Sequence, residues 1–572
     1  MSGLPIYPFD PLRCIGSVLE VTPYETKVNL PFAAKPEGKI LYGNHLGAGE
    51  VGEFIFIECG NTAIFGRIVS VKLPERERLS VESELGQKSE AHPFGTVQLL
   101  ASVNLKDGSV ESGLTQYPRL GCRVFSAHPE LVTWIAESSS QKIYKESAAT
   151  LDVAYIPDYI CTPVRLLPEH IFGRHCTILG ATGGGKSWTI ARLIEEAIRY
   201  KSKIILMDAT GEFHTLCNEG VYHVHFGSEQ FNYENCKNKS VEVVFPYTAL
   251  KENDLFAIFT PSGQTQAPKL RAAMKSLKLA RLKPELYPDG IVKKADQDKE
   301  SFYEIYRENI NDIENPLANF NIYCLTKQIE EECIFPTDTK KPGKWGSYNT
   351  NELSYCISLI TRIEDVLSAP EFNCIFKIEG KTSILDELES FLKKDDLRVF
   401  RISLKNVSFS HNVREVLANA IGRHLLTMAR EGRFQEQPII LFLDEAHQFL
   451  NKTLGDENNR YSLDAFELIA KEGRKFSLNI CISTQRPRDI PEGVLSQMGA
   501  LIVHRLTNDR DREVVERACG EFSKSVAAFL PNLVPGEAMI VGVDFPIPVT
   551  VQISEPTSKP DSMGPDFQKH WR

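Results

Sequence analysis

The stretch Gly180-Ala-Thr-Gly-Gly-Gly-Lys-Ser187 decides the fold. It matches the pattern G-x-x-x-x-G-K-S/T and stands between a strand-like apolar run, 176–179, and a helical run, 188–200. Glycines let successive backbone N–H groups surround phosphate oxygens without clashes from Cβ atoms. The following helix directs the positive end of its dipole at the same anion. The stretch therefore predicts a phosphate-binding loop in an α/β nucleotide-binding domain.

The loop also predicts its own contacts. We expect Lys186 to reach the β- and γ-phosphates and to be needed for hydrolysis, and Ser187 to bind Mg²⁺. ATP and Mg²⁺ are therefore the expected cofactors of an ATPase. The residues expected to contact the nucleotide are Gly180, Ala181, Thr182, Gly183, Gly184, Gly185, Lys186, Ser187 and Trp188.

Pro438-Ile-Ile-Leu-Phe-Leu-Asp-Glu445 is an apolar run that ends in two acids. A strand buried on both faces of a parallel sheet is uniformly apolar, and ligands bind at the carboxyl ends of such strands. We therefore expect Asp444 to hold Mg²⁺ through water and Glu445 to polarise the water that attacks the γ-phosphate. The alternative is that both acids are merely solvated at the end of a strand.

A third apolar run, Leu478-Asn-Ile-Cys-Ile-Ser-Thr-Gln-Arg-Pro487, also ends in polar residues. Gln485 has the reach to contact the γ-phosphate or the attacking water, and a loop amide without such a role is the alternative. Arg474 precedes this run, and its forked guanidinium suits the charge of a transferring phosphoryl group. Arg174 is a second candidate for that role. The sequence leaves open whether either arginine acts in its own subunit or across an interface, or forms only a surface ion pair.

The next strand-like run after the phosphate loop ends in Leu206-Met-Asp-Ala-Thr-Gly-Glu-Phe213. Asp208 and Glu212 lie at its carboxyl end. Asp208 and Glu212 either help to order Mg²⁺ or water or have a purely structural role. The sequence does not distinguish these two alternatives.

The rest of the chain falls into regions of different pattern. Residues 1–160 contain short β-rich runs separated by glycine and proline, which favours a small β-barrel over a β-sandwich. Apolar strand-like runs alternate with helical patterns in 161–247 and 396–554, which predicts a RecA-like P-loop core built on a mostly parallel sheet. A charged, helical pattern over 248–395 predicts a helical insertion, and 555–572 is expected to be an extended or disordered tail.

Composition excludes several classes of protein. The 572 residues are 42% hydrophobic and 24% charged, as in globular proteins, and the net charge is −10, so any basic DNA-binding surface must be local. The 13 cysteines show no metal-binding spacing, the closest pair being Cys324 and Cys333, and scattered cysteines suggest reduced thiols and a cytoplasmic protein. We find no signal peptide and no apolar run long enough to cross a membrane, so no membrane association is expected.

Together these motifs resemble the HerA family of hexameric DNA translocases, within the HerA–FtsK group of P-loop motors. The residues that carry the resemblance are Gly180-Ala-Thr-Gly-Gly-Gly-Lys-Ser187, Asp208-Ala-Thr-Gly-Glu-Phe213, Leu443-Asp-Glu-Ala-His447, Ser483-Thr-Gln-Arg-Pro487 and, in the N-terminal region, Ile64-Phe-Gly-Arg-Ile-Val69. The resemblance implies a homohexamer with nucleotide between neighbours and double-stranded DNA in a central channel. It also implies a nuclease or a NAD-consuming effector docked on the barrel, in DNA end processing or anti-phage defence.

Two segments are candidates for the DNA contacts. Residues 451–460 are polar and follow the acidic pair, where a pore loop would lie. In 269–283, Arg271, Lys275 and Lys278 are spaced as neighbours on one helical face, and such cations bind DNA phosphates without regard to sequence. An ordinary surface loop and a solvated helix face are the respective alternatives.

We expect an ATP-driven motor that translocates on or unwinds double-stranded DNA together with its partner. One alternative is a ring scaffold that assembles and activates an effector, with hydrolysis as a switch. A secretion or conjugation coupling ATPase is the other, and the absence of an apolar membrane segment argues against it.

Overall fold

The computed structural model describes residues 4–33, 39–41, 44–74, 92–141, 148–157, 162–227, 240–316, 318–450, 452–456, 459–518, 527–562 and 567–571. The chain forms two compact units. The first consists of Met1–Lys201 and Asn479–Pro560, and the second of Ser202–Leu478 and Asp561–Arg572. Each is described by itself.

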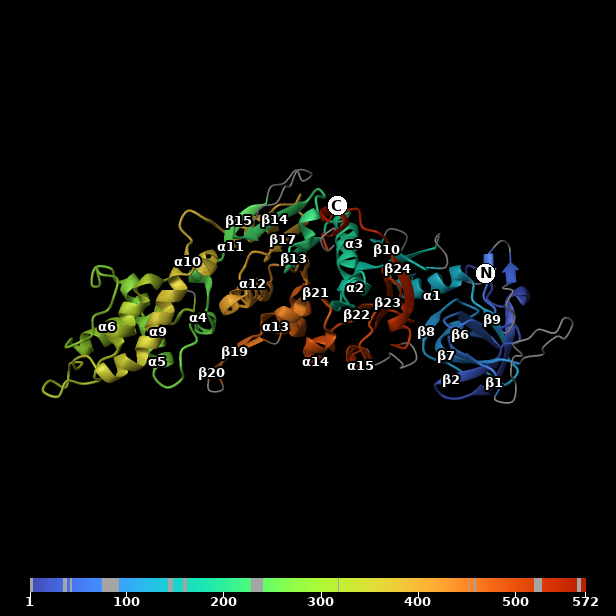
Figure 1. The fold of residues 1–572 in the computed structure, drawn as a ribbon, viewed down its shortest axis with the longest axis horizontal. Coiled ribbons are helices and arrows are strands. Elements are labelled where there is room, and N and C mark those ends of the chain that lie inside the picture. Colours follow the sequence, from blue (N-terminus) through green and yellow to red (C-terminus); the bar gives the residue numbers. More distant parts are fainter. Residues whose placement is uncertain are drawn as a thin grey trace. The chain divides into compact units, whose positions relative to one another are not determined.

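A closed barrel forms the N-terminal part of the first unit (Figure 1, blue). Its strands follow the order β2-β1-β9-β5-β6-β7, and β7 pairs with β2 to close the ring, while β8 (Val110–Ser112) extends β7. Ile15, Ile57, Ile64 and Val97 fill the interior and are at most 1% exposed. Closure confirms the expected barrel and overturns the β-sandwich alternative. The six closing strands are β1 (Cys14–Val21), β2 (Glu25–Asn29), β5 (Phe54–Cys59), β6 (Thr62–Lys72), β7 (Phe94–Asn104) and β9 (Arg123–Ser126).

The first unit also contains a mixed sheet in the order β11-β10-β24-β23-β22-β12-β21. Strand β12 lies parallel to both β21 and β22, whereas β22, β23, β24, β10 and β11 follow one another antiparallel. Helix α3 (Lys186–Ile198) follows β12 directly, so the phosphate loop joins a buried strand to a helix. The strands are β10 (Leu151–Tyr155), β11 (Pro163–Leu166), β12 (Cys176–Leu179), β21 (Leu478–Thr484), β22 (Ala500–His504), β23 (Glu537–Gly542) and β24 (Val549–Ile553).

The second unit contains a parallel sheet in the order β18-β13-β17-β14-β15-β16. All six residues of β13 are buried, as expected of a parallel strand covered on both faces. One of them is Lys203, whose Nζ donates to the carbonyl oxygens of Phe391, Lys394 and Leu397 at 2.8, 2.6 and 2.8 Å. The strands are β13 (Lys203–Asp208), β14 (Val221–Phe226), β15 (Val241–Val244), β16 (Thr382–Ser383), β17 (Val399–Ser403) and β18 (Ile439–Leu443).

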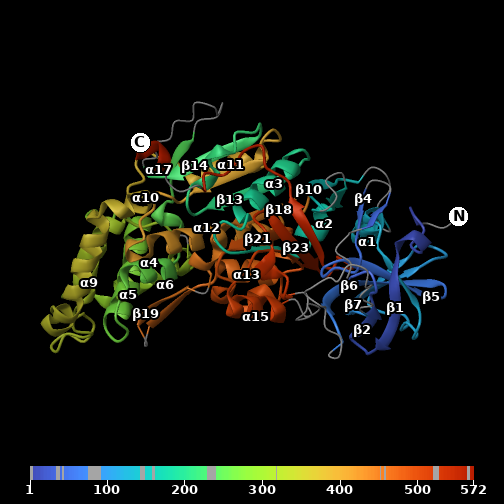
Figure 2. The same ribbon diagram turned by 45° about the vertical axis from the view of Figure 1, so that its right-hand side comes forward.

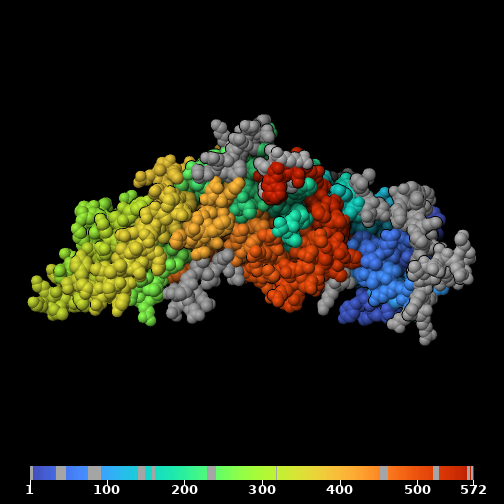
Figure 3. All heavy atoms as spheres, in the orientation of Figure 1, coloured from blue at the N-terminus to red at the C-terminus, as the bar shows by residue number. Residues whose placement is uncertain are grey.

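Helices dominate the chain between β15 and β17, apart from the short edge strand β16. The ribbon views place α5 beside α9 (Figures 1 and 2), and the spheres of this region form one continuous green and yellow surface (Figure 3). Its interior holds a buried ion pair, Lys294 Nζ to Glu332 at 2.7 Å. The helices of four turns or more are α5 (Gln266–Leu282) and α9 (Thr350–Ser368), and the shorter ones are α4 (Glu252–Phe259), α6 (Lys299–Glu308), α7 (Ile310–Glu314), α8 (Leu325–Glu332), α10 (Asn373–Phe376) and α11 (Ile384–Lys393).

The expected fold class, a P-loop core with an N-terminal barrel, is confirmed. The tail is held where it begins, because Glu195 of α3 accepts hydrogen bonds from the N–H groups of Thr557 and Ser558 at 3.0 and 2.7 Å. One smaller expectation needs correction. The expectation of reduced thiols is wrong at Cys217, which is disulfide-bonded. No helix among the described residues has the length and apolar character needed to span a membrane.

Candidate nucleotide-binding site

The phosphate loop has the backbone conformation that glycine permits. Gly183 and Gly185 have φ values of +75° and +114°. A Cβ on Gly180 would stand 2.6 Å from the Cβ of His504, so the start of the loop also has room only for glycine. The loop therefore needs glycines for two reasons, its left-handed backbone and its close contact with β22.

Lys186 is the first residue of α3 and is 8% exposed. Its Nζ donates to the carbonyl oxygen of Ala181, 3.2 Å away, at the start of the same loop. The ammonium group thus lies folded back over the loop that it belongs to. A phosphate held by the loop would meet this charge at once.

His504, which sequence reasoning missed, packs behind the loop. Its Nδ1 lies 2.8 Å from the carbonyl oxygen of Glu537 and its Nε2 lies 2.8 Å from Oγ1 of Thr189 in α3. Because a carbonyl oxygen only accepts, Nδ1 carries the proton, and Nε2 accepts from the Thr189 hydroxyl. Complete burial lowers the pKa of His504 to about 4, and the charge of Lys186 adds to the effect. The ring is therefore neutral.

Gln485 lies against the phosphate loop. It follows β21, and its Oε1 accepts from Oγ1 of Thr182 at 2.5 Å. Strand register explains the contact, because Thr484 is paired with Leu179, the last residue before the loop. The structure thus brings Gln485 and the loop together within the first unit.

Asp208, at the end of β13, is completely buried and organises the turn that follows. Its Oδ1 accepts from the N–H of Gly211 at 2.7 Å, and its Oδ2 accepts from the N–H of Phe213 at 3.0 Å. Oδ2 also pairs with Nε of Arg401 in β17 at 2.7 Å, and neither side chain is exposed. These contacts occupy both oxygens, so they favour the structural role of Asp208 over a direct role at Mg²⁺.

Asp444 and Glu445 follow β18, as expected. Asp444 is 4% exposed, and burial raises its pKa well above the usual range, with further increases from the charges of Asp208, Glu445 and Glu212. A divalent cation would relieve this accumulation of negative charge. Carboxylate oxygens are ligands that Mg²⁺ prefers, so the residues fit the ion.

Glu445 adopts a left-handed backbone conformation, with φ of +47°. Such a conformation is uncommon for residues other than glycine and occurs often at functional sites. Nδ1 of His447 lies 3.2 Å from Glu445 Oε2, but without the alignment of a hydrogen bond. Glu445 thus combines an uncommon backbone conformation with one carboxylate oxygen that lacks a hydrogen-bond donor among the described residues.

The two candidate arginines differ in their surroundings. Arg474 lies in the short 3-10 helix Gly473–Phe476 and is exposed, and its side chain forms no ion pair within the described part of the chain. Nε of Arg174 lies 3.3 Å from Oδ2 of Asp544, in a partly exposed ion pair. Trp188, expected near the nucleotide, is half-buried in α3 with Nζ of Lys559 5.7 Å from its ring centre.

In the candidate DNA-binding face in 269–283 the cations have partners within the helical insertion, which favours the alternative of an ordinary helix face, and DNA contact here stays a prediction. Arg271 pairs with Glu252 at 2.6 Å and Lys275 pairs with Glu314 at 2.5 Å. Lys278 is 8% exposed, and its Nζ donates to the carbonyl oxygens of Ile313 and Asn315. All three cations therefore have partners within the helical insertion.

Residues 451–460 form most of a hairpin made by β19 (Lys452–Asp456) and β20 (Asn459–Leu463), which are paired in antiparallel register. Their side chains, and residues 451, 457 and 458 altogether, lie outside the part of the chain that the structure describes. The expectation of a pore loop here stays a prediction.

Two family models match this chain. The model of the central domain of the helicase HerA matches residues 153–401, and the model of the HerA-like C-terminal domain matches residues 424–571. The chain belongs to the HerA helicase family. As a family member it is a P-loop ATPase that uses ATP and Mg²⁺, and the phosphate loop and the acids at the end of β18 suit these two ligands.

Individual relatives agree with the assignment to HerA. A probable helicase of Methanocaldococcus jannaschii is 24% identical over 81% of this chain and 79% of its own length. The DNA double-strand break repair helicase HerA of Saccharolobus solfataricus is 25% identical over 70% of this chain and 68% of its own length. Among solved structures, VirB4 of Thermoanaerobacter pseudethanolicus is 14% identical, with a TM-score of 0.44 over 73% of this chain and 99% of that one.

Proposed function

We propose that this HerA-family ATPase is a homohexameric ring motor that moves along or unwinds double-stranded DNA in the cytoplasm, together with a nuclease or another effector bound to its barrel. The observation that carries the proposal is the match of both HerA helicase domains to a chain with a complete phosphate loop and an acidic pair whose first member, Asp444, is buried. The relatives named as DNA double-strand break repair helicases support DNA as the track. The nine free cysteines among the described residues support the cytoplasmic location, and the disulfide at Cys217 is the exception.

Each residue of the site has a role in this proposal. Lys186 binds the β- and γ-phosphates, and Ser187 and Asp444 hold Mg²⁺, which neutralises phosphate charge when bound. Glu445 orients and polarises the attacking water, which its place directly after Asp444 and its one carboxylate oxygen without a donor among the described residues support.

Two further residues complete the proposed mechanism. Gln485 senses the γ-phosphate from its position on Thr182. Arg474 acts on the nucleotide of a neighbouring subunit, which its exposure and lack of an ion pair among the described residues support. Arg174 is the weaker candidate, because Asp544 already pairs with it.

The decisive experiment measures ATP hydrolysis with and without linear double-stranded DNA and, in parallel, displacement of a third strand bound to that DNA. A motor hydrolyses ATP faster with DNA and displaces the third strand only while ATP is hydrolysed. The Glu445→Gln variant serves as the control that binds nucleotide without turnover. Hydrolysis that requires an effector protein, ignores DNA and displaces nothing would instead identify a ring scaffold.

A further inference from the structure

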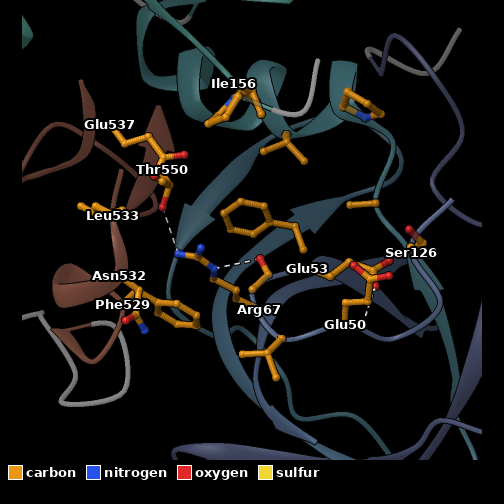
Figure 4. Close-up of a pocket in the computed structure, with 18 residues that line it drawn as sticks. Glu50, Glu53, Arg67, Ser126, Ile156, Phe529, Asn532, Leu533, Glu537 and Thr550 are labelled. Carbon is orange, nitrogen blue, oxygen red and sulfur yellow. Dashed lines mark hydrogen bonds between the residues drawn. The ribbon is translucent and has the colours of Figure 1, made fainter. Parts of the chain in front are cut away.

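A cavity of about 630 Å³ lies within the first unit, where the barrel meets β23 and β24 (Figure 4). It is separate from the phosphate loop, since none of the residues 180–187 lines it. Its walls come from the barrel segment Gly47–Phe54, from Arg67 of β6, and from Phe529, Glu537 and Thr550.

Arg67 is the central charged group of this cavity. It is 7% exposed, and burial lowers its pKa to about 10. Its guanidinium carbon lies 4.1 Å from the ring centre of Phe529 and 5.1 Å from that of Phe54, so aromatic rings flank the charge. Burying a cation is costly, and the charge of Glu537 offsets only part of this effect, because Arg67 forms no ion pair within 4.0 Å with any described residue.

The hydrogen bonds of Arg67 leave part of its fork unused. Nε donates to the carbonyl oxygen of Gly52 at 3.0 Å, and one terminal nitrogen donates to Oγ1 of Thr550 at 3.2 Å. A guanidinium has five N–H groups, so these two bonds leave three. The remaining donors suit an oxyanion, which guanidinium groups bind through two parallel hydrogen bonds.

The carboxylates in the wall do not cancel this preference. Glu53 points to its own loop, where Oε2 accepts from the N–H groups of Gly49 and Glu50 at 2.9 and 3.0 Å. Burial raises the pKa of Glu53, while the nearby Ser126 hydroxyl opposes the rise, and Oε1 makes no well-aligned hydrogen bond with a described residue. Glu537 accepts from the N–H of Val534 at 2.9 Å. An acceptor without a well-aligned donor calls for an N–H or O–H group on the ligand.

We propose that this cavity is a second ligand site, for a small molecule that carries a carboxylate or phosphate group for Arg67 and an N–H or O–H donor for Glu53. The proposal does not depend on the ring-motor function proposed above. Bound there, the ligand would lie close to the support of the phosphate loop: Glu537 lines the cavity, and the N–H of the preceding residue, Gly536, donates to the carbonyl oxygen of Gly184 at 3.2 Å. The site is thus placed to act as an effector site.

Binding is tested by titrating the full-length protein with inorganic phosphate and, separately, with L-glutamate, followed by calorimetry. Both probes carry an oxyanion and a donor, and the two titrations distinguish phosphate from carboxylate. The Lys186→Ala background weakens phosphate binding at the phosphate loop. We expect saturable binding of at least one probe in this background, loss of binding on Arg67→Met, and a dissociation constant about tenfold higher on Arg67→Lys, which keeps the charge but loses the fork.

Arg123→Met is the matched control, because Arg123 is an exposed barrel arginine that pairs with Glu58 outside the cavity wall. It should bind the probe like the parent protein. Circular dichroism and the thermal midpoint establish that each variant is folded, and Arg67→Lys keeps the test available if Arg67→Met unfolds. The proposal is overturned if neither probe binds saturably, or if folded Arg67 variants bind as tightly as the Arg123 control.

Discussion

His504 illustrates how one residue at the end of a strand can set the environment of a binding loop. Its ring contacts both ends of the phosphate loop: a Cβ on Gly180 would clash with its Cβ, and a Cβ on Gly185 would stand 3.2 Å from its Cε1. A protonated ring would place a second positive charge beside Lys186 in a fully buried position. Neutrality is therefore part of its structural role.

This neutrality predicts acid sensitivity. Above about pH 6.5 His504 is neutral in both the folded and the unfolded protein. As the pH falls from about 6.5 to 4, only the unfolded chain gains the proton, so the free energy of unfolding should decrease, by up to about 3 kcal/mol. In His504→Asn this decrease should be smaller. Urea midpoints at pH 7 and pH 5 measure it, and equal midpoint shifts in the variant and the parent would refute the expectation.

A second prediction concerns Glu445. The Glu445→Gln variant should bind ATP but fail to hydrolyse it, because glutamine cannot take a proton from the attacking water. Nucleotide extracted after gel filtration should be mainly ATP. Lys186→Ala is the contrasting variant and should retain little nucleotide of either kind. Recovery of mainly ADP from Glu445→Gln would remove Glu445 from the role of base.

A third prediction concerns Arg401, whose loss would leave Asp208 buried with two amide donors and no counter-ion. Removing one partner of such a pair costs about 3–5 kcal/mol of folding free energy. Arg401→Met should therefore lower the thermal midpoint strongly. Arg433→Met, which removes a partly exposed partner of Glu389, should change it little. Equal effects of the two substitutions would contradict the structural role given to the buried pair.

At the scale of elements, helix α3 links the phosphate loop at its first residue to the C-terminal tail through Glu195. Glu195→Ala should free residues 557 and 558 from the helix. We expect the amide hydrogens of Thr557 and Ser558 to exchange with deuterium faster in this variant than in the parent. Glu467→Ala, on the exposed face of α13 (Ala465–Glu472), is the control, and mass spectrometry of the fragments over time gives the rates.

The sequence predicts those features that depend on residues close together in the chain. It does not predict features that depend on residues far apart. Lys186, Asp444 and Gln485 follow strands whose apolar pattern is visible in a few residues. The ion pairs of Arg271 and Lys275 are not visible in this way, because Glu252 and Glu314 come from other helices. The same holds for Arg67, whose burial depends on Phe529 and Thr550, far along the chain.

His504 is an instructive intermediate case. Leu501-Ile-Val-His504 is an apolar run that ends in a polar residue, which is the pattern that drew attention to Asp444. Applying the same rule to this strand would have found the residue. Its role would still have required the neighbours that only the fold provides, Thr189 and Glu537.

For the whole molecule, the proposed ring predicts that Arg474 is needed for hydrolysis but not for assembly. Arg474→Ala should assemble as the parent does, because the substitution removes an exposed side chain, but should lose ATPase activity. Light scattering after size exclusion and a hydrolysis assay measure the two properties. Arg430→Ala, which removes an exposed arginine paired with Glu472, is the control and should keep both.

Mixing the subunits tests whether Arg474 acts across an interface. Arg474→Ala subunits retain an intact phosphate loop, and Lys186→Ala subunits retain Arg474. If the arginine serves a neighbour, mixed assemblies should regain part of the activity that each variant lacks alone. Mixed assemblies that exchange subunits but stay inactive would argue that the arginine acts within its own subunit.

The buried Lys203 has a wider consequence for how this family can vary. Its ammonium group binds the last turn of α11 and the chain just beyond it to strand β13, directly before the chain re-enters the sheet as β17. The end of the helical insertion is therefore fixed to β13, whatever the sequence of the helices that precede α11. A change in the length or sequence of the helical insertion before α11 would therefore leave the register of β13 and β17 undisturbed. The insertion can vary while the ATPase core stays the same.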